Sequence, residues 1–269
     1  MCVRNAAYAL AQDLPHETSY GAMPVIVYEP FSGALRHGNF LDASYSAVLS
    51  HPGWIRRLQK IHAQAKRCLP RKDRSWKELD SSMSSDALLM NVFCHPRALS
   101  RSGRLMLGVG VTEVPEFGFK ARVPLRGGRT DRTEIDMKLG ELLTEADFQI
   151  KEPEVVESYR DLEEVFDCEA LPRRDGLYLS YQLIRNVLAA HVLALDFCVL
   201  LDARRPDLME AWYVVMRSVR IPELRTRCKV LSWQELSAML SPALRHFLDL
   251  KYGIVSPGRN PSDLGLAHP

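Results

Sequence analysis

The chain has 269 residues, of which 46% are hydrophobic and 25% are charged, and its formal net charge is +2. This is an ordinary globular composition with enough apolar residues for one large core. The small net charge does not by itself indicate a nucleic-acid-binding protein. The most apolar segment, residues 187–201, is too short to span a bilayer and is interrupted by His191 and Asp196, which argues against a membrane protein.

The cysteines and the N-terminus indicate the cellular compartment. The six cysteines are widely spaced and form neither a C-x-x-C pair nor a His/Cys cluster with the spacing of a zinc site. The N-terminus has no basic segment followed by an apolar stretch, so we expect no signal peptide. We therefore expect a cytoplasmic protein with reduced thiols.

Composition suggests how the chain is organised. Residues 1–45 are rich in Pro, Gly and Asn, with a short strand candidate at 25–28, and we expect an irregular N-terminal arm. Residues 46–255 are expected to form a single α/β domain, because one core explains a chain of this length better than two. Residues 256–269 contain Gly, Pro and Ser and are expected to form a loose tail.

The first half of this domain is expected to begin with helices and to continue with strands. Pro52 favours the first turn of a helix, and the segment Ser84-Ser85-Asp86 is expected to cap the next one. The expected elements are helices over 54–68 and 87–93, strands over 105–114 and 117–123, and a turn over 126–129.

The second half of the domain alternates strands with helices. Apolar residues at helical spacing indicate the helices, and short apolar runs indicate the strands. Strands joined by helical crossovers predict an α/β fold with a mixed central sheet flanked by helices. The expected elements are strands over 133–138 and 142–148, helices over 154–165 and 179–195, a strand over 196–202, a helix over 205–219, a strand over 227–232 and a final helix capped by Ser232.

Charge is unevenly distributed along the chain. Residues 54–74 and 97–132 are rich in Lys and Arg, whereas acids outnumber bases over residues 133–175. Such asymmetry can mark a polyanion-binding face beside an acidic metal site. Charges scattered over solvated faces explain the same pattern equally well.

The segment 133–151 combines a strand pair with acidic residues. Alternation places Asp136 on one face of the first strand and Glu145 and Asp147 on one face of the second, so their carboxylates can meet across a turn at 139–141. Two carboxylates on neighbouring strands can hold the metal ion that phosphodiester hydrolysis requires. An exposed amphipathic hairpin with polar outer residues is the structural alternative.

Several features of the chain resemble the PD-(D/E)xK superfamily, which has the restriction-endonuclease-like fold. Asp136, followed by Glu145 on the next strand, resembles the carboxylate hairpin of that superfamily. Residues 84–93 resemble the helix that precedes the catalytic strands, and Gln182 resembles the supporting glutamine on a helix of RecB-like members. The order of elements over residues 75–250 also agrees.

This resemblance implies a metal-dependent DNA nuclease. It implies that Asp136 and Glu145 bind Mg²⁺ or Mn²⁺, with Glu78 as an additional candidate ligand. It further implies that Lys151 assists the attacking water and that Gln182 supports the site from the following helix.

The lysine of the superfamily pattern is missing from its usual place. Asp147 occupies that position, two residues after Glu145. Lys151, in a variant Gln149-x-Lys arrangement, or Lys138 on the neighbouring strand can restore the charge. A shortened hairpin with an inactive site is the third interpretation.

Two functions therefore stay open. One is a metal-dependent DNA endonuclease or exonuclease, and the other is a catalytically inactive nuclease-fold protein that binds nucleic acid or a protein partner. The oligomeric state, including a homodimer, is open as well. Phosphate contacts need bases close to the site. The arginines expected to contact DNA are Arg126, Arg129, Arg132, Arg101 and Arg104.

Overall fold

The computed structural model describes residues 2–18, 25–29, 36–61, 77–110, 112–132, 134–146, 148, 150 and 158–257. The chain forms two compact units, unit 1 from residues 1–103 with 233–269 and unit 2 from residues 104–232. The expected division into an arm, one domain and a tail stays a prediction. Every helix in the described ranges is too short or too polar to cross a membrane.

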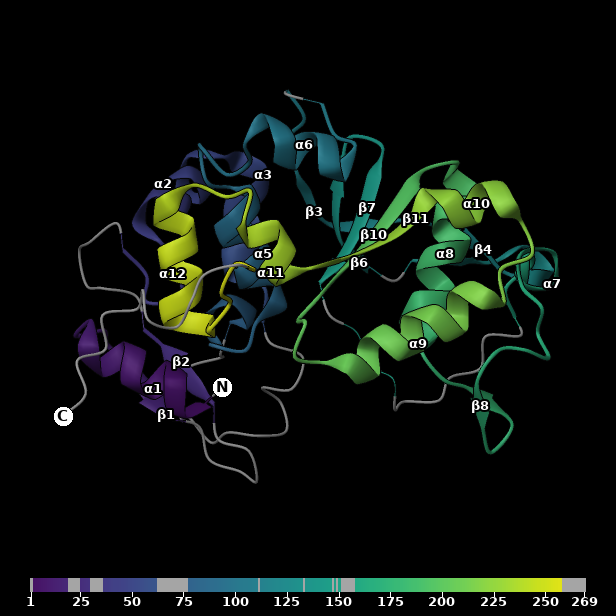
Figure 1. The fold of residues 1–269 in the computed structure, drawn as a ribbon, viewed down its shortest axis with the longest axis horizontal. Coiled ribbons are helices and arrows are strands. Elements are labelled where there is room, and N and C mark those ends of the chain that lie inside the picture. Colours follow the sequence, from purple (N-terminus) through teal and green to yellow (C-terminus); the bar gives the residue numbers. More distant parts are fainter. Residues whose placement is uncertain are drawn as a thin grey trace. The chain divides into compact units, whose positions relative to one another are not determined.

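Unit 2 is built on a sheet whose strands are β3 (Glu116–Lys120), β6 (Glu134–Leu139), β7 (Leu142–Ala146), β10 (Asp196–Leu201) and β11 (Cys228–Ser232). The strand order is β11-β10-β7-β6-β3 (Figure 1). The pairs β3–β6 and β6–β7 are antiparallel, whereas β7–β10 and β10–β11 are parallel. The sheet is therefore mixed, as the sequence predicts.

The parallel connections of this sheet pass through helices. α8 (Tyr181–Leu193) lies between β7 and β10 in the chain, and α9 (Pro206–Arg217) and α10 (Pro222–Arg227) lie between β10 and β11. Figure 1 shows these helices gathered beside β10 and β11. The flanking helices complete the predicted α/β fold. Apolar residues at the spacing of one helical face bury α8 in the core. They are Leu183, Ile184, Val187 and Leu188.

One helix of unit 2 is shorter than predicted. Among the described residues, the helix expected over 154–165 forms only from Leu162. Residues 158–161 are held in another conformation, because Arg126 N donates to Ser158 O at 2.7 Å and the backbone of Tyr159 forms a bridge to the same segment. The smaller elements of the unit are β4 (Val123–Pro124), η3 (Arg126–Gly128), β5 (Thr130–Asp131), α7 (Leu162–Val165), β8 (Arg173–Arg174) and β9 (Leu177–Tyr178).

Unit 1 is mainly helical. Ser84 caps α5 as predicted, since its hydroxyl accepts a hydrogen bond from Ala87 N at 3.1 Å. The last residues of α6 belong to unit 2. The elements are α1 (Cys2–Ala11), β1 (His16–Thr18), β2 (Ile26–Tyr28), α2 (Asp42–Ser50), α3 (Pro52–Ile55), η1 (Arg56–Gln59), η2 (Glu78–Asp80), α5 (Ser85–Phe93), α6 (Arg101–Leu107), α11 (Trp233–Ser237) and α12 (Pro242–Tyr252).

The N-terminal segment contains regular structure that the sequence did not lead us to expect. α1 lies within residues 1–45, which were expected to be irregular. Its buried Ala9 packs with Ile26 and Tyr28 of β2. This small apolar cluster packs α1 against β2.

Two further expectations are corrected. The helix expected over 54–68 ends at Gln59, because Lys60 is extended and its carbonyl accepts a hydrogen bond from Glu78 N at 2.8 Å. The strand expected over 105–114 is wrong, because α6 continues through Leu107. Gly108 follows with a φ of +71°, which ends that helix.

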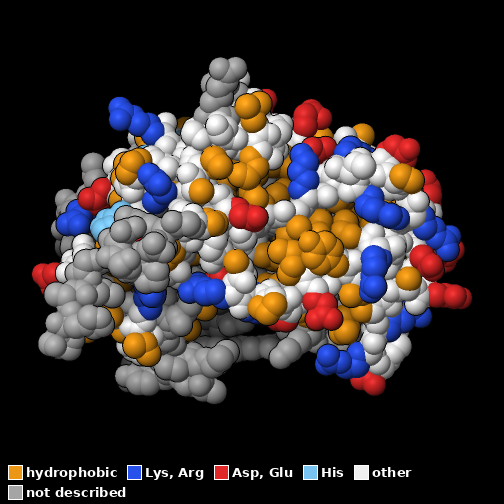
Figure 2. Space-filling view, viewed as in Figure 1, with side chains coloured by type: hydrophobic (Ala, Val, Ile, Leu, Met, Phe, Trp, Pro, Cys, Tyr) orange, Lys and Arg blue, Asp and Glu red, His pale blue; other side chains and the backbone are white. Residues whose placement is uncertain are grey.

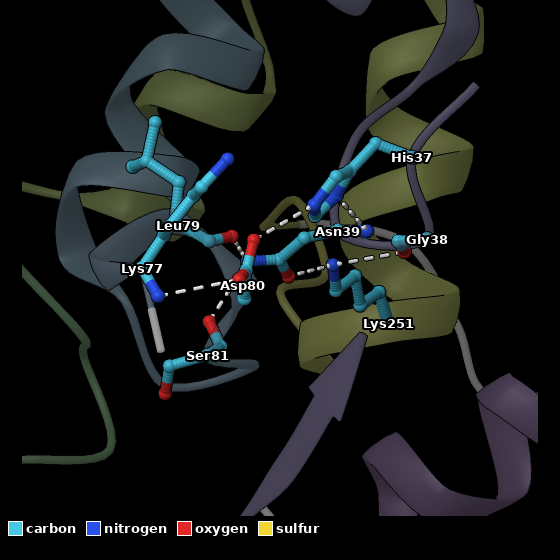
Figure 3. A network of polar contacts seen from close by, with 8 residues as sticks. All are labelled: His37, Gly38, Asn39, Lys77, Leu79, Asp80, Ser81 and Lys251. Atoms are coloured by element: carbon cyan, nitrogen blue, oxygen red, sulfur yellow. Dashed lines mark hydrogen bonds and ion pairs between the residues drawn. The ribbon is translucent and has the colours of Figure 1, made fainter. Parts of the chain in front are cut away.

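A buried lysine of α12, Lys251, joins distant segments of unit 1 (Figure 3). Its Nζ donates to Asn39 Oδ1 and, at 3.5 Å, to Gly38 O. The Asn39 amide nitrogen donates to Leu79 O at 2.7 Å and to Ser81 O at 2.8 Å. One asparagine therefore links three segments that are far apart in the sequence.

The environment of Lys251 disfavours its charged form. Burial lowers the pKa of Lys251 well below its ordinary value of 10.5, because the ammonium group loses its water and contacts no carboxylate in the described structure. Aromatic faces between 4.6 and 5.7 Å from Nζ offset part of this cost. The rings belong to Tyr8, Tyr28, Phe247 and Tyr252.

Replacing Asn39 with alanine is expected to lower the free energy of unfolding by about 3 kcal/mol. The change leaves Leu79 O, Ser81 O and Lys251 Nζ buried without this partner. Urea unfolding followed by circular dichroism measures the effect. Gln12→Ala, at an exposed position of the same unit, is the control. An unfolding midpoint for Asn39→Ala equal to that of the wild type would contradict the proposed role of this asparagine.

The lowered pKa of Lys251 also predicts a pH dependence of stability. Between the native pKa and 10.5, the unfolded chain binds more protons than the native chain, so stability rises with pH in this window. Lys251→Met removes the titrating group and keeps a long side chain. Relative to this variant, the wild type should gain stability in urea unfolding as the pH rises toward 10.5. If the difference in unfolding free energy between the wild type and Lys251→Met does not change with pH, the buried amine of Lys251 stays protonated and this prediction is wrong.

Candidate functional site

The two acidic strands form the hairpin that alternation predicts. β6 pairs antiparallel with β7, with Met137 opposite Thr144. The turn contains Gly140, whose φ of +59° favours glycine. A Cβ added at Gly140 would meet only the end of the exposed, flexible Glu113 side chain, so the backbone conformation is what favours glycine at this turn.

Asp136 and Glu145 are brought together on this hairpin. Extending the register by one pair beyond Met137 and Thr144 places them opposite each other. Ala146 N donates to Asp136 Oδ2 at 3.0 Å, and Asp136 N lies 3.5 Å from Glu145 Oε2. Glu145 is only 2% exposed, although a carboxylate is costly to bury.

The first turns of α8 supply amide donors to the buried carboxylate. Gln182 Nε2 lies 3.3 Å from Glu145 Oε1, and Asn186 Nδ2 lies 3.0 Å from Glu145 Oε2. Residues four apart share a helical face, so one face of α8 holds both oxygens of this group. The supporting role of Gln182 stays a prediction. Asn186 was missed, although its spacing from Gln182 is a signal that could have found it.

Arg185 is a second residue of α8 that sequence reasoning missed. Its side chain is 2% exposed and lies in the network of the buried carboxylate. Nε and Nη2 donate to Asn186 Oδ1 at 3.1 and 2.8 Å, and Nη2 also donates to Glu134 O at 2.9 Å. An arginine within an apolar helix forms no motif, so only the folded structure reveals this position.

Of the two lysines considered for the site, the structure describes Lys138 but not Lys151. Lys138 of β6 is half-buried, and its Nζ lies 5.6 Å from the centre of the Phe119 ring. Asp147 and Lys151 lie outside the described residues, so the role of Lys151 stays a prediction. Within the described ranges, no three His, Cys, Asp or Glu side chains cluster as a set of metal ligands.

Glu78, the additional candidate ligand, belongs to unit 1. Its carboxylate lies 2.9 Å from Lys60 Nζ. This ion pair accounts for the position of the acid without a metal. Its role as a metal ligand stays a prediction.

The arginines expected to contact DNA have different surroundings. Arg126 forms an exposed ion pair with Glu163 at 2.8 Å. Arg104 donates to a backbone carbonyl at 2.8 Å, and Arg129 is exposed. The side chain of Arg101 lies outside the described residues. Their contact with DNA stays a prediction.

Arg132 lines a groove of about 840 Å³ beside the edge strand β3. Lys120 and Arg122 line the same groove, together with a single acid. Lys120 is paired with Glu134, two residues before Asp136 on β6. The basic part of the groove therefore lies at the end of the sheet that holds the carboxylate pair.

The distribution of charge over the surface indicates less about where DNA would bind than this groove does. Figure 2 shows basic and acidic side chains intermixed around apolar patches on one face of the molecule. A face of mixed charge does not indicate a polyanion-binding surface. The groove is more specific because three bases line it beside the carboxylate hairpin.

The comparison with protein families agrees with this geometry. A family model described as restriction endonuclease associating with ARP matches residues 5–253. Neither the curated proteins nor the solved structures contain a match to the chain. The match extends over both units and confirms the resemblance to restriction-endonuclease-like nucleases. The chain therefore belongs to the family of restriction endonucleases associating with ARP.

Proposed function

We propose that the chain is a deoxyribonuclease that hydrolyses phosphodiester bonds with Mg²⁺ or Mn²⁺. The observation that supports this most strongly is the pairing of Asp136 with Glu145 on neighbouring strands, with Gln182 and Asn186 bonded to the second carboxylate. Family membership supports nuclease activity in general. The carboxylate pair, in which Glu145 is buried and Asp136 is half-buried, favours a metal-dependent reaction.

The residues of the site fit a hard divalent cation. Mg²⁺ and Mn²⁺ prefer oxygen ligands, and Asp136 and Glu145 supply carboxylate oxygens from adjacent strands. A bound ion of this kind would add positive charge at the phosphate and make water a better nucleophile. The resemblance to the superfamily adds two residues to this proposal. Glu78 would be a further metal ligand, and Lys151 would orient the attacking water.

The chain's own contacts prepare the carboxylates for this role. The amides of Gln182 and Asn186 fix the orientation of the Glu145 carboxylate. The backbone N–H of Ala146 fixes one oxygen of Asp136. Ligands held in place by surrounding hydrogen bonds bind a metal ion with less reorganisation.

The proposed substrate is DNA, held by its phosphate backbone. Arg132, Lys120 and Arg122 line one groove beside the hairpin, where phosphates of a bound strand would meet positive charge. Arg126, Arg129, Arg104 and Arg101 are further candidates for phosphate contact. We propose that this reaction takes place in the cytoplasm.

The second candidate function is binding without cleavage. It is favoured by Asp147, which occupies the position where the superfamily pattern has lysine. In that case the same fold would bind nucleic acid or a protein. The family description names an association with ARP, so we include a protein partner of this kind in the second proposal.

Asp136→Asn is expected to reduce DNA cleavage by about 1000-fold or more, because it removes a charged metal ligand while keeping the shape of the side chain. Plasmid and linear DNA are incubated with Mg²⁺ or Mn²⁺, and with EDTA as the metal-free reference. Asp175→Asn, at an exposed position of unit 2, is the matched control. If the wild type cleaves no DNA, or if Asp136→Asn cleaves as well as the wild type, the catalytic proposal is wrong.

Arg132→Ala and Lys120→Ala are each expected to weaken DNA binding without changing any sequence preference. Each change should lower the slope of log affinity against log salt concentration by about 1, because one phosphate contact is lost. Fluorescence anisotropy over a salt series, with Ca²⁺ replacing the catalytic metal, measures both effects. Arg217→Ala, at the exposed end of α9, serves as the control. Equal slopes for all these proteins would exclude the groove as the phosphate-binding surface.

A further inference from the structure

The carboxylate pair requires a positive charge beside it in order to act on a phosphate. Negative charge that develops on the phosphate oxygens is stabilised by fixed N–H donors, and more strongly by charged ones. Asp147 stands where the superfamily pattern has lysine. Among the described residues, the cation that is hydrogen-bonded into the Glu145 network is Arg185.

The guanidinium of Arg185 is fixed from two elements. Asn186 of α8 accepts hydrogen bonds from Nε and Nη2, and the backbone carbonyl of Glu134 on β6 accepts one from Nη2. Asn186 also donates to Glu145, and Glu134 lies two residues before Asp136. Arg185 is thus anchored in the same polar network as the carboxylate pair.

One edge of this guanidinium is unused. Nη1 is buried and has no hydrogen-bond partner in the described structure. The acceptors of the other two nitrogens are an amide oxygen and a backbone carbonyl, so none of these hydrogen bonds goes to a carboxylate. The Tyr181 ring, whose centre lies 5.8 Å from Cζ, offsets part of the positive charge. An arginine is always charged, and a buried N–H donor without an acceptor is costly. The arrangement therefore calls for an anionic acceptor that a ligand supplies.

We propose that Arg185 provides the positive charge of this site in place of the lysine, with Nη1 donating to an oxygen of the scissile phosphate of DNA. This inference rests on the proposed function. In the hydrolysis, the water oxygen bonds to phosphorus and the bond to the leaving sugar oxygen breaks. The proton released by the water reaches that oxygen through solvent. Arg185 keeps its protons throughout and only donates hydrogen bonds.

The test compares the full chain with Arg185→Gln and Arg185→Lys. Cleavage of linear DNA is measured with Mn²⁺, and binding of a labelled DNA duplex is measured with Ca²⁺. Arg185→Gln is expected to lose about 100-fold in cleavage and about 10-fold in affinity. Arg185→Lys keeps the charge but loses the paired bonds to Asn186, so its losses should be intermediate. Arg217→Gln is the matched control and should behave as the wild type.

Loss of folding must be separated from loss of charge, because Arg185 is buried. The melting temperature of each variant is measured first. Arg185→Ala is then assayed with added guanidinium ion at low concentration. If cleavage depends on the positive charge of Arg185, added guanidinium ion should restore part of the DNA cleavage by Arg185→Ala without raising its melting temperature. A folded Arg185→Ala protein whose cleavage guanidinium does not restore would overturn the proposal.

The remaining outcomes separate this inference from the proposed function. If the wild type does not cleave DNA with Mg²⁺ or Mn²⁺, the nuclease function fails, and the contact of Arg185 is judged from binding in Ca²⁺. Equal affinities of Arg185→Gln and the wild type would then overturn the phosphate contact, whereas a selective loss would support it. If Arg185→Gln cleaves normally and Lys151→Ala does not, the lysine supplies the charge and the inference is wrong.

Discussion

The burial of the Glu145 carboxylate is the constraint on which the geometry of unit 2 depends. A charged group that is 2% exposed is tolerated only if hydrogen-bond donors replace its lost water. Those donors come from the side chains of Gln182 and Asn186, and both lie on the first turns of α8. α8 must therefore pass directly beside this part of β7. The crossover that connects β7 to β10 in parallel places it there.

This arrangement links the site to the core. The apolar face of α8 is buried with Leu143 of β7 and Val199 of β10, while its first turns contact the Glu145 carboxylate of β7. A shift of the helix would disturb both core packing and the orientation of the carboxylate. Ser180, just before α8, is buried with a φ of +57°, which is an uncommon conformation for a residue other than glycine. Such backbone strain is maintained only where the surrounding packing enforces it.

The two units use buried polar groups in different ways. In unit 1, Lys251 and Asn39 satisfy backbone carbonyls and hold segments together. In unit 2, Arg185 and Asn186 surround a carboxylate and leave Nη1 of the arginine without an acceptor in the described structure. Buried polar atoms without a hydrogen-bond partner also occur among the described residues of unit 1, for example in Asn5 and Tyr28. The place of Arg185 in the Glu145 network is therefore what distinguishes its Nη1.

The sequence by itself determined the sheet and the pairing of its acids. Strand alternation and a glycine turn are local properties, so they predict that Asp136 faces Glu145. The N-cap at Ser84 is local as well. Tertiary contacts decided the rest. The helix after residue 54 ends where Lys60 pairs with Glu78, and Arg185 and Asn186 join the site only because α8 crosses beside β6 and β7. The contacts of Lys60 and of Arg185 have no sequence pattern, since each joins residues far apart in the chain. Asn186 is marked only by its four-residue spacing from Gln182.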